Sequence, residues 1–319
     1  MRGSRTLFTA SANFLPIPLL CEIAQHTGAP IVHTYHTLYE QYSRYVIHSQ
    51  ALGSRLVPRL VKWRLRSASD VIVPTEKVAH ILTGYQIDKP IHVVPTGLDL
   101  TRFERRITPE RRMRLRARYG MEDKDFVLIY IGRLGAEKSI DRLLTLLSKT
   151  LITQPDVKLL LVGDGPERNR LEEEAIRLNV WDHVAFTGMV APEEVSEYYQ
   201  LGDVFVSAST SETQGLTYVE AAASGLPLIC ADDPCLDGVL RSGINGAVFD
   251  TAEAFVSAVC QMKNDSEYRW RAGLCSRSMA AKFSKQVFAA SAEDVYASVC
   301  EVQKVQGGGE RPHDYDNAF

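Results

Sequence analysis

Residues 126–139 read FVLIYIGRLGAEKS and carry the chain from a buried strand through a turn into a helix. The first six residues are all aliphatic or aromatic, which is typical of a parallel strand covered on both faces. Glycines at 132 and 135 then break the run, and a helical pattern occupies Ser139–Thr153. This order of strand, glycine turn and helix predicts an α/β fold that binds ligands at the carboxyl ends of its strands.

Seven more apolar runs of strand length alternate with helix-length segments such as Glu167–Asn179. The runs are Pro30–His33, Asp70–Pro74, Ile91–Pro95, Lys158–Val162, His183–Thr187, Val204–Ser207 and Pro227–Cys230. Alternation of this kind predicts parallel sheets with helices on both sides.

The segment Gly97–Asp125 interrupts this alternation and holds eight arginines between Arg102 and Arg118. We therefore predict two Rossmann-like lobes that face a cleft. Residues 1–105 form a partial N-terminal, acceptor-side lobe, and residues 106–303 form a donor-binding lobe with closing helices. The first lobe has only three strand candidates and lacks an early strand followed by a glycine-rich loop, so we expect it to be truncated. The polar, glycine-rich residues 304–319 are expected to be disordered.

The bulk composition is that of a soluble globular protein, with 45% hydrophobic and 24% charged residues. A net charge of −3 argues against a nucleic-acid partner. The six cysteines form no C-x-x-C pair and have no spaced histidine partners, so neither a metal site nor a disulfide scaffold is expected. No apolar run reaches transmembrane length and no signal-peptide pattern is present, so the expected location is the cytoplasm.

The stretch Ser209–Pro227 reads STSETQGLTYVEAAASGLP and directly follows a strand. It predicts a loop and then a helix that begins near Gly215 and ends before a second glycine. Gly215 lets the backbone approach a ligand without a Cβ atom in the way. The amides of Leu216 and Thr217 are then unpaired donors at a helix N-terminus, a position that favours a diphosphate.

Two acids and two cations complete this pattern. Glu220 lies one turn into the helix, where it can accept both hydroxyls of a ribose, and Glu212 precedes the helix, where it can face sugar hydroxyls. Arg133 and Lys138 flank the glycine turn after the strand at 126–131, where two fixed cations can neutralise a leaving pyrophosphate. The alternative interpretation is that all four are solvated surface residues near strand–helix turns.

Two further strand-end loops belong to the same lobe. Gly163–Pro166 contains Gly165 and follows one strand, and Gly188–Val190 follows the next, where backbone groups can pair with the edge of a base. Each is a weak signal by itself, because such turns are common in α/β proteins.

In combination, these motifs resemble the retaining glycosyltransferases of the GT-B fold, of the family-four type that uses nucleotide sugars. The resemblance spans Ala29–Val302 and includes the E-x7-E motif from Glu212 to Glu220, the GRL-x-x-EK signature and the linker VPTGLDLTRF. It implies that the two cations hold the donor diphosphate, that Glu220 binds ribose and that Glu212 contacts the sugar. Together with the glycine loops and the helix N-terminus described above, it gives the donor-binding set Gly132, Arg133, Lys138, Gly165, Met189, Val190, Glu212, Gly215, Leu216, Thr217 and Glu220.

The segment His33–Glu40, HTYHTLYE, resembles the acceptor-side motif of bacterial diacylglycerol α-glucosyltransferases, which use UDP-glucose. That resemblance implies that His36 lines the cleft and joins Arg133, Lys138 and Glu212 among the catalytic residues. The alternative for His36 is a structural histidine at a strand end.

Residues 54–67, SRLVPRLVKWRLRS, predict a basic amphipathic helix. Five cations and no acid lie between Arg55 and Arg66, with Leu56, Leu60 and Trp63 on the adjoining side. Such a helix fits an interfacial anchor on anionic lipid, and the arginines at 102–118 would add to it. The competing interpretation is a core-packed helix with a solvated basic face.

The resulting hypothesis is transfer of a hexose, glucose from UDP-glucose, to a lipid hydroxyl at the inner face of a membrane, without metal or other cofactor. Alternatives are a soluble sugar or inositol-type acceptor, a non-catalytic nucleotide-sugar-binding protein, and, more distantly, a sugar-nucleotide epimerase of two lobes.

Overall fold

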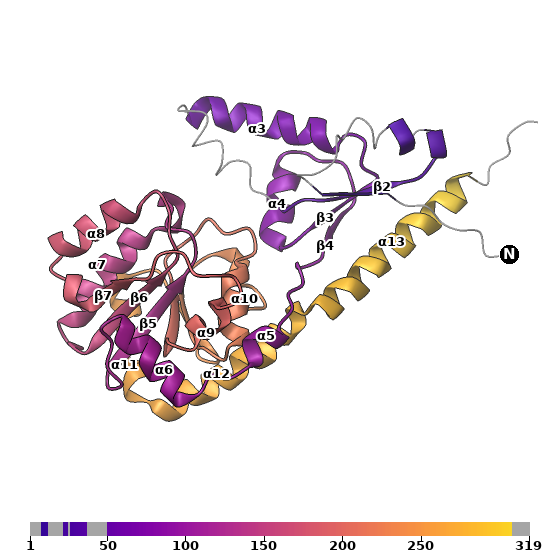
Figure 1. Ribbon diagram of the computed structural model, residues 1–319. Coiled ribbons are helices and arrows are strands. Elements are labelled where there is room, and N and C mark those ends of the chain that lie inside the picture. The colour runs from indigo at the N-terminus through magenta and orange to yellow at the C-terminus, as the bar shows by residue number, and fades with distance from the viewer. Residues whose placement is uncertain (1–7, 12–21, 25, 37–49, 308–319) are drawn as a thin grey trace, which may run out of the picture. The chain divides into compact units, whose positions relative to one another are not determined.

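The computed structural model describes residues 8–11, 22–24, 26–36 and 50–307. The chain divides into two compact units, and each consists of helices and a parallel sheet (Figure 1). The first unit comprises residues 1–96 and 286–319, and the second comprises residues 97–285. The predicted α/β class with two parallel-sheet units is confirmed.

The first unit contains four parallel strands in the order β1-β2-β3-β4. They are β1 Phe8–Ser11, β2 Ile31–Thr34, β3 Asp70–Val73 and β4 Ile91–Val93. Helices α3 (Gln50–Leu65) and α4 (Glu76–Gly84) share one apolar cluster with β3. Val295 and Val299 of the final helix, α13 (Lys285–Gly307), join a second cluster with residues of β2 and β3.

Strand β1 corrects the expectation that the first lobe lacks an early strand. It pairs in parallel with β2, from Phe8 opposite Ile31 to Ser11 opposite Thr34. Its sequence, FTAS, contains one large apolar residue, so hydrophobic patterning alone does not mark it. The ten residues after β1 lie outside the described residues, so the expected absence of a glycine-rich loop stays a prediction.

The second unit contains six parallel strands in the order β10-β9-β8-β5-β6-β7. They are β5 Phe126–Ile131, β6 Val157–Val162, β7 Val184–Phe186, β8 Val204–Ser207, β9 Leu228–Ala231 and β10 Gly246–Phe249. The chain starts at β5, runs outward to β7, and then returns to β8 on the other side of β5. This reversal makes the edge between β5 and β8 the topological switch point, where open α/β sheets bind ligands.

Helices cover both faces of this second sheet. They are α5 Thr101–Glu104, α6 Pro109–Arg118, α7 Ile140–Leu151, α8 Arg168–Arg177, α9 Val195–Tyr199, α10 Leu216–Ala223, α11 Ala252–Asn264 and α12 Ser266–Ala280. Figure 1 shows α7 and α8 on one side of the sheet and α9 and α10 on the other. Alternate residues of β5 enter two separate cores, Leu128 with α7 and Ile129 with α10. The uninterrupted apolar run of β5 is therefore a consequence of burial on both faces.

The boundary between the units differs from the expected position after residue 105. Phe103 of α5 packs edge-on against Tyr199 at 5.8 Å, and Leu115 of α6 enters the core of the second unit. The division therefore lies between Thr96 and Gly97. Helix α13 was expected to close the second lobe, but it packs on the sheet of the first. It also extends to Gly307, into the tail that was expected to be disordered. The remainder of that tail, 308–319, lies outside the described residues.

One arginine of the basic segment is buried and joins α6 to the sheet. The side chain of Arg116 is 2% exposed and donates to Asp203 Oδ2 at 2.8 Å and to the Leu201 carbonyl at 2.9 Å. The same Asp203 oxygen accepts the Val127 N–H at 2.8 Å, so the carboxylate ties α6 to the start of β5.

Replacing Arg116 with alanine should lower the free energy of unfolding by about 3 kcal/mol or more, because the substitution leaves the partly buried Asp203 without one of its charged donors. The measurement is a denaturant unfolding curve. Arg114→Ala on the same helix is the control, and a change within about 0.5 kcal/mol is expected there, because Arg114 is exposed. Equal destabilisation by the two substitutions would contradict this assignment.

Candidate functional site

The loops at the carboxyl ends of β5, β6 and β7 are joined to one another by backbone hydrogen bonds. Leu134 N–H donates to the Asp164 carbonyl at 2.9 Å, and Gly163 N–H donates to the Gly188 carbonyl at 3.1 Å. Gly163 has φ +126°, and a Cβ atom there would lie 2.1 Å from the carbonyl oxygen of Gly132. Glycine is therefore required where these loops approach one another.

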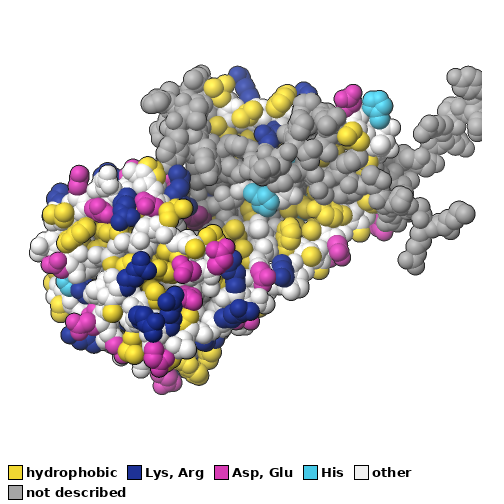
Figure 2. Space-filling view, viewed as in Figure 1, with side chains coloured by type: hydrophobic (Ala, Val, Ile, Leu, Met, Phe, Trp, Pro, Cys, Tyr) yellow, Lys and Arg dark blue, Asp and Glu magenta, His cyan; other side chains and the backbone are white. Residues whose placement is uncertain are grey.

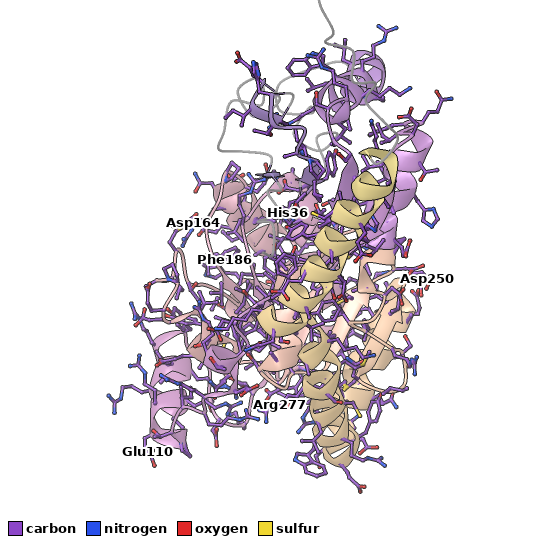
Figure 3. The ribbon with its side chains drawn as sticks, turned by 90° about the vertical axis from the view of Figure 1, so that its right-hand side faces the viewer. His36, Glu110, Asp164, Phe186, Asp250 and Arg277 are labelled. Atoms are coloured by element: carbon purple, nitrogen blue, oxygen red, sulfur yellow. The ribbon has the colours of Figure 1, made fainter. Side chains whose placement is uncertain are left out.

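Asp164 and Phe186, both labelled in Figure 3, mark the ends of β6 and β7. Asp164 Oδ1 accepts the N–H of Gly165 at 2.7 Å, and its Oδ2 accepts from Arg168 at 3.4 Å. These bonds hold the loop after β6 in one conformation. A Cβ atom on Gly165 would lie 2.4 Å from the Leu134 carbonyl oxygen, so this predicted glycine also serves loop packing.

An ion pair connects the loops that follow β5 and β8. Lys138 ends the 3-10 turn η1 (Ala136–Lys138), and its Nζ lies 2.6 Å from Glu212 Oε1. The Ser209 hydroxyl donates to the same oxygen at 2.9 Å. The two charged side chains are 21% and 16% exposed, so the pair is shielded but accessible. Two residues predicted from separate motifs therefore meet at the switch point.

Arg133 lies on the same loop and is paired with an acid that the sequence analysis did not single out. Its NH2 lies 2.5 Å from Glu137 Oε1, and its side chain is 46% exposed against 14% for Glu137. The Ser211 hydroxyl donates to the Glu137 carbonyl at 2.8 Å, a second connection between the β5 and β8 loops. Burial raises the pKa of Tyr130, the charges of Glu212 and Glu137 raise it further, and the phenol stays protonated.

The N-terminus of α10 faces the same strand edge. Gly215 is its N-cap residue with φ 69° and ψ 57°, and no side chain caps the helix. A Cβ atom at Gly215 would lie 2.5 Å from the ring of Tyr218, so the position requires glycine for conformation and for space. The N–H groups of the first turn, including those of Leu216 and Thr217, lack acceptors within the helix and supply a partial positive charge.

Glu220 occupies the next turn of α10 and is held by a buried tyrosine. The Tyr199 hydroxyl donates to Glu220 Oε2 at 2.8 Å. Burial raises the pKa of Glu220 above its ordinary value of 4.5, whereas the Tyr199 hydrogen bond and the charge of Arg102 lower it. Neither Tyr199 nor Arg102 belongs to a sequence motif that predicts this site, since a buried tyrosine in the pair at 198–199 resembles an ordinary core residue.

Three further predicted residues, Met189, Val190 and His36, differ in exposure and in the unit to which they belong. Met189 is 84% exposed at the β7 end, whereas Val190 packs against the core of the second unit. His36 belongs to the first unit, and its Nδ1 lies 3.4 Å from the Thr96 hydroxyl. Burial, then the charges of Arg64 and His36, lower the pKa of the neighbouring His33 to about 4, as expected for a structural histidine.

The described residues contain no cluster of three or more His, Cys, Asp or Glu side chains with the geometry to hold a metal ion. The candidate site contains cations and helix amides that can hold an anionic group, and two glutamates that can accept hydrogen bonds from hydroxyl groups.

Comparison with protein families gives two matches in chain order. Residues 8–102 match the family model described as Glycosyltransferase Family 4, and residues 112–277 match the model described as Glycosyl transferases group 1.

Individual proteins are also similar to this chain in sequence. The chain is 38% identical over 251 residues to alpha-monoglucosyldiacylglycerol synthase of Streptococcus pneumoniae, covering 77% of this chain and 57% of that protein. It is 30% identical over 288 residues to the Acholeplasma laidlawii synthase of the same name, covering 88% and 72%. A D-inositol 3-phosphate glycosyltransferase of Segniliparus rotundus is also 30% identical, over 72% of this chain and 51% of that protein.

Solved structures share the fold at lower identity. The Anabaena protein HepE in complex with UDP superposes with a TM-score of 0.75 at 20% identity, covering 91% of this chain and 79% of that chain. Sucrose-phosphate synthase of Thermosynechococcus elongatus gives a TM-score of 0.76 at 24% identity, covering 93% and 74%.

Replacing Tyr199 with phenylalanine should raise the pKa of Glu220 further, because burial is kept and the donor to its carboxylate is lost. A carbon-detected NMR titration of the glutamate carboxyl groups measures this change. Tyr198→Phe is the matched control, because that hydroxyl bonds to Tyr119 at 2.9 Å and not to Glu220. An unchanged Glu220 titration in the Tyr199 variant would show that the hydrogen bond has no influence.

Proposed function

The chain belongs to the group 1 glycosyltransferases, and on that premise we propose that it transfers glucose from UDP-glucose to the hydroxyl of a lipid such as diacylglycerol, with retention of the anomeric configuration. The chain spans 57% of the length of the Streptococcus pneumoniae relative, so the proposal concerns the reaction that these two units support. The observation that supports it most is the Lys138–Glu212 ion pair at the β5–β8 switch point.

Donor binding is assigned to the strand edge that this pair occupies. The diphosphate of the donor takes the place of Glu212 as the anionic partner of Lys138, and Arg133 and the first amides of α10 contribute further positive charge. Glu212 is then released toward the hydroxyls of the sugar. Glu220, with one oxygen held by Tyr199, keeps the other for the ribose hydroxyls.

The proposed chemistry balances without a metal-dependent step. The lipid hydroxyl attacks the anomeric carbon on the face from which UDP departs, and the bond from that carbon to the diphosphate oxygen breaks. The electron pair leaves with UDP, and the hydroxyl proton passes to a phosphate oxygen. Arg133, Lys138 and the α10 amides stabilise the charge that develops on the diphosphate. His36 of the first unit is assigned to the transferred sugar.

A lipid acceptor is supported by the names of the two synthases and by helix α3. Val57, Val61 and Leu65 are buried against the first unit, whereas Leu56, Leu60 and Trp63 are 41%, 48% and 51% exposed. The exposed face also carries Arg59, Lys62 and Arg66, and the guanidinium carbon of Arg66 lies 5.4 Å from the Trp63 ring centroid. One face of α3 therefore packs in the core, and its other face is basic and apolar, which supports the proposed contact with lipid.

Exposed apolar residues among cations suit the interface of an anionic bilayer. Among the described helices, none has the length and apolar character needed to cross a bilayer. On the basis of the exposed basic and apolar face of α3, the proposal places the protein at the inner surface of the membrane.

Substituting alanine for Lys138 or Arg133 should weaken UDP binding about tenfold or more, because each change removes a charge-assisted contact with the diphosphate. Calorimetric titration with UDP measures the effect. The control is Lys149→Ala on α7, whose Nζ forms a long ion pair with Glu253 at 3.8 Å, and the affinity of this variant for UDP should match that of the unmodified chain. Undiminished UDP affinity in the Lys138 variant would remove its assigned role.

The acceptor is tested by supplying radiolabelled UDP-glucose with diacylglycerol in anionic vesicles, with diacylglycerol in detergent micelles, or with inositol phosphate. Glucosylated diacylglycerol is the expected product. The double substitution Leu60→Asp with Trp63→Asp should reduce transfer on vesicles and spare transfer in micelles, because it affects only the membrane contact. Ile176→Asp, at an exposed position on α8, is the control.

Product from inositol phosphate alone would favour a soluble acceptor. UDP binding without any product would favour a non-catalytic nucleotide-sugar-binding protein.

A further inference from the structure

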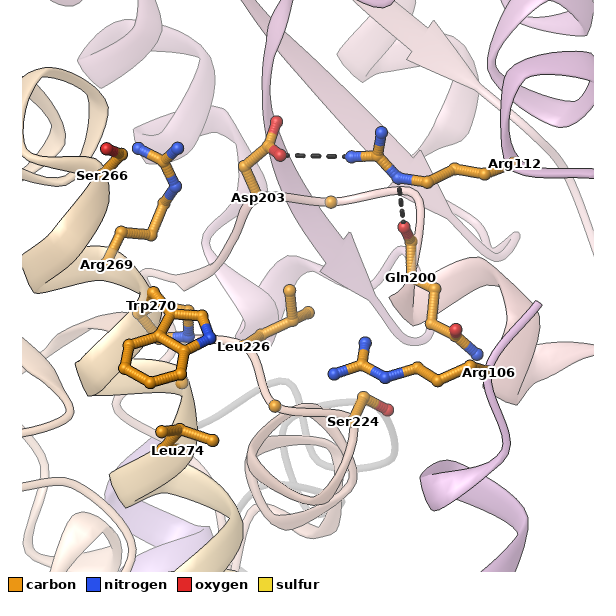
Figure 4. A pocket seen from close by; sticks show the side chains of 14 residues that line it. Arg106, Arg112, Gln200, Asp203, Ser224, Leu226, Ser266, Arg269, Trp270 and Leu274 are labelled. Atoms are coloured by element: carbon orange, nitrogen blue, oxygen red, sulfur yellow. Dashed lines mark hydrogen bonds and ion pairs between the residues drawn. The ribbon is translucent and has the colours of Figure 1, made fainter. Parts of the chain in front are cut away.

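A pocket of about 370 Å³ opens in the second unit at the strand edge opposite the candidate donor site (Figure 4). Its wall includes Gly202 and Asp203 just before β8, and Pro227 just before β9, so it lies at the amino ends of these strands. The donor site lies at their carboxyl ends. The pocket and the candidate donor site are therefore separated by the length of the strands.

Cations dominate the polar part of this pocket. Arg106, Arg112 and Arg269 line it, against one acid, Asp203. Arg112 already donates to Asp203 Oδ1 at 3.2 Å, and Arg269 donates to the Lys263 carbonyl at 3.2 Å. Within the part of the chain that the structure describes, the Arg106 guanidinium has no ion pair or hydrogen bond. Figure 4 shows that Arg106 points into the pocket between Ser224 and Leu226.

The opposite wall is apolar and unusually exposed. Trp270 and Leu274, on successive turns of α12, are 65% and 46% exposed. A second hollow of about 360 Å³ shares Arg106 and Arg112 with the first, and its wall includes Met113, which is 48% exposed. Because the two hollows share these arginines, they adjoin one another, and they are here together called the α6–α12 groove, which has apolar side chains in the wall of each hollow.

Figure 2 shows several dark blue Lys and Arg side chains over the part of the second unit where α6 lies, interspersed with magenta Asp and Glu and with apolar side chains. At the floor of the groove, the buried Ser224 hydroxyl has no hydrogen-bond partner among the described residues, which is uncommon for a buried polar group. The groove therefore combines an unpaired cation with exposed apolar surface and no obvious intramolecular use for either.

We propose that the α6–α12 groove binds the phosphate diester of an anionic phospholipid headgroup, with Arg106 on the phosphate and Trp270 in the adjoining interfacial layer of the bilayer. An anion alone would explain Arg106 but would leave Trp270, Leu274 and Met113 exposed to water. A bilayer surface explains both, because tryptophan and arginine are the side chains that suit its interface. This contact is independent of α3 and of the transfer reaction.

The test uses the full chain with Trp63→Phe and Trp181→Phe, so that Trp270 is the only remaining tryptophan of three. Its fluorescence is followed with phosphatidylcholine vesicles, with the same vesicles containing phosphatidylglycerol, with phosphatidylglycerol vesicles that carry brominated acyl chains, and with glycerol phosphate in solution. The expected result is a blue shift with phosphatidylglycerol vesicles and quenching by the brominated lipid. Arg106→Gln should weaken this response about fivefold, the equivalent of one cation near an anionic surface.

Arg114→Gln is the matched control, since Arg114 is an exposed arginine of α6 that lines neither hollow. Equal losses in the Arg106 and Arg114 variants would reduce the effect to general charge and overturn the proposal. So would vesicle binding that leaves Trp270 unquenched, which would assign membrane contact to α3 alone. A response to glycerol phosphate without one to vesicles would overturn it in favour of a soluble ligand. Glucose transfer in detergent micelles should be unchanged in the Arg106 variant, which separates this inference from the proposed function.

Discussion

The ion pair between Lys138 and Glu212 is the contact on which the site depends. It connects the loop that follows β5 to the loop that follows β8. These strands are neighbours in the sheet, although 72 residues lie between the end of β5 at Ile131 and the start of β8 at Val204. The reversal of strand order at this point creates the gap into which both loops project. The loops after β5, β6 and β7 are also joined to one another by backbone hydrogen bonds at the carboxyl ends of their strands.

Hydrophobic patterning was sufficient for the strands that are buried on both faces. It predicted β5, β8 and β9 closely, because each is a continuous apolar run. It missed β1 and β10, FTAS and GAVF, which carry small residues and gain their strand conformation from a neighbouring strand. A Cβ atom on Gly246 of β10 would lie 1.8 Å from the Leu228 carbonyl oxygen, so its strand depends on a close approach that no local pattern reveals.

The candidate site shows the same division between local and long-range information. Motif spacing identified Arg133, Lys138, Glu212 and Glu220, and the structure pairs two of them directly. It did not identify Tyr199, whose partner Glu220 is 21 residues away, or Glu137, whose pairing with Arg133 depends on the conformation of the turn between them. Spacing also could not distinguish the arginines of the arginine-rich segment from one another. Arg116 is buried in an ion pair, whereas Arg106 lines an open groove.

In the proposed donor complex, Lys138 changes its anionic partner from Glu212 to the donor diphosphate. A crystal structure of the chain with UDP tests this most directly. The account predicts that Lys138 Nζ lies within about 3 Å of a diphosphate oxygen, with Glu212 no longer its partner. A structure in which UDP binds elsewhere, or in which the Lys138–Glu212 pair stays intact beside bound UDP, would contradict it.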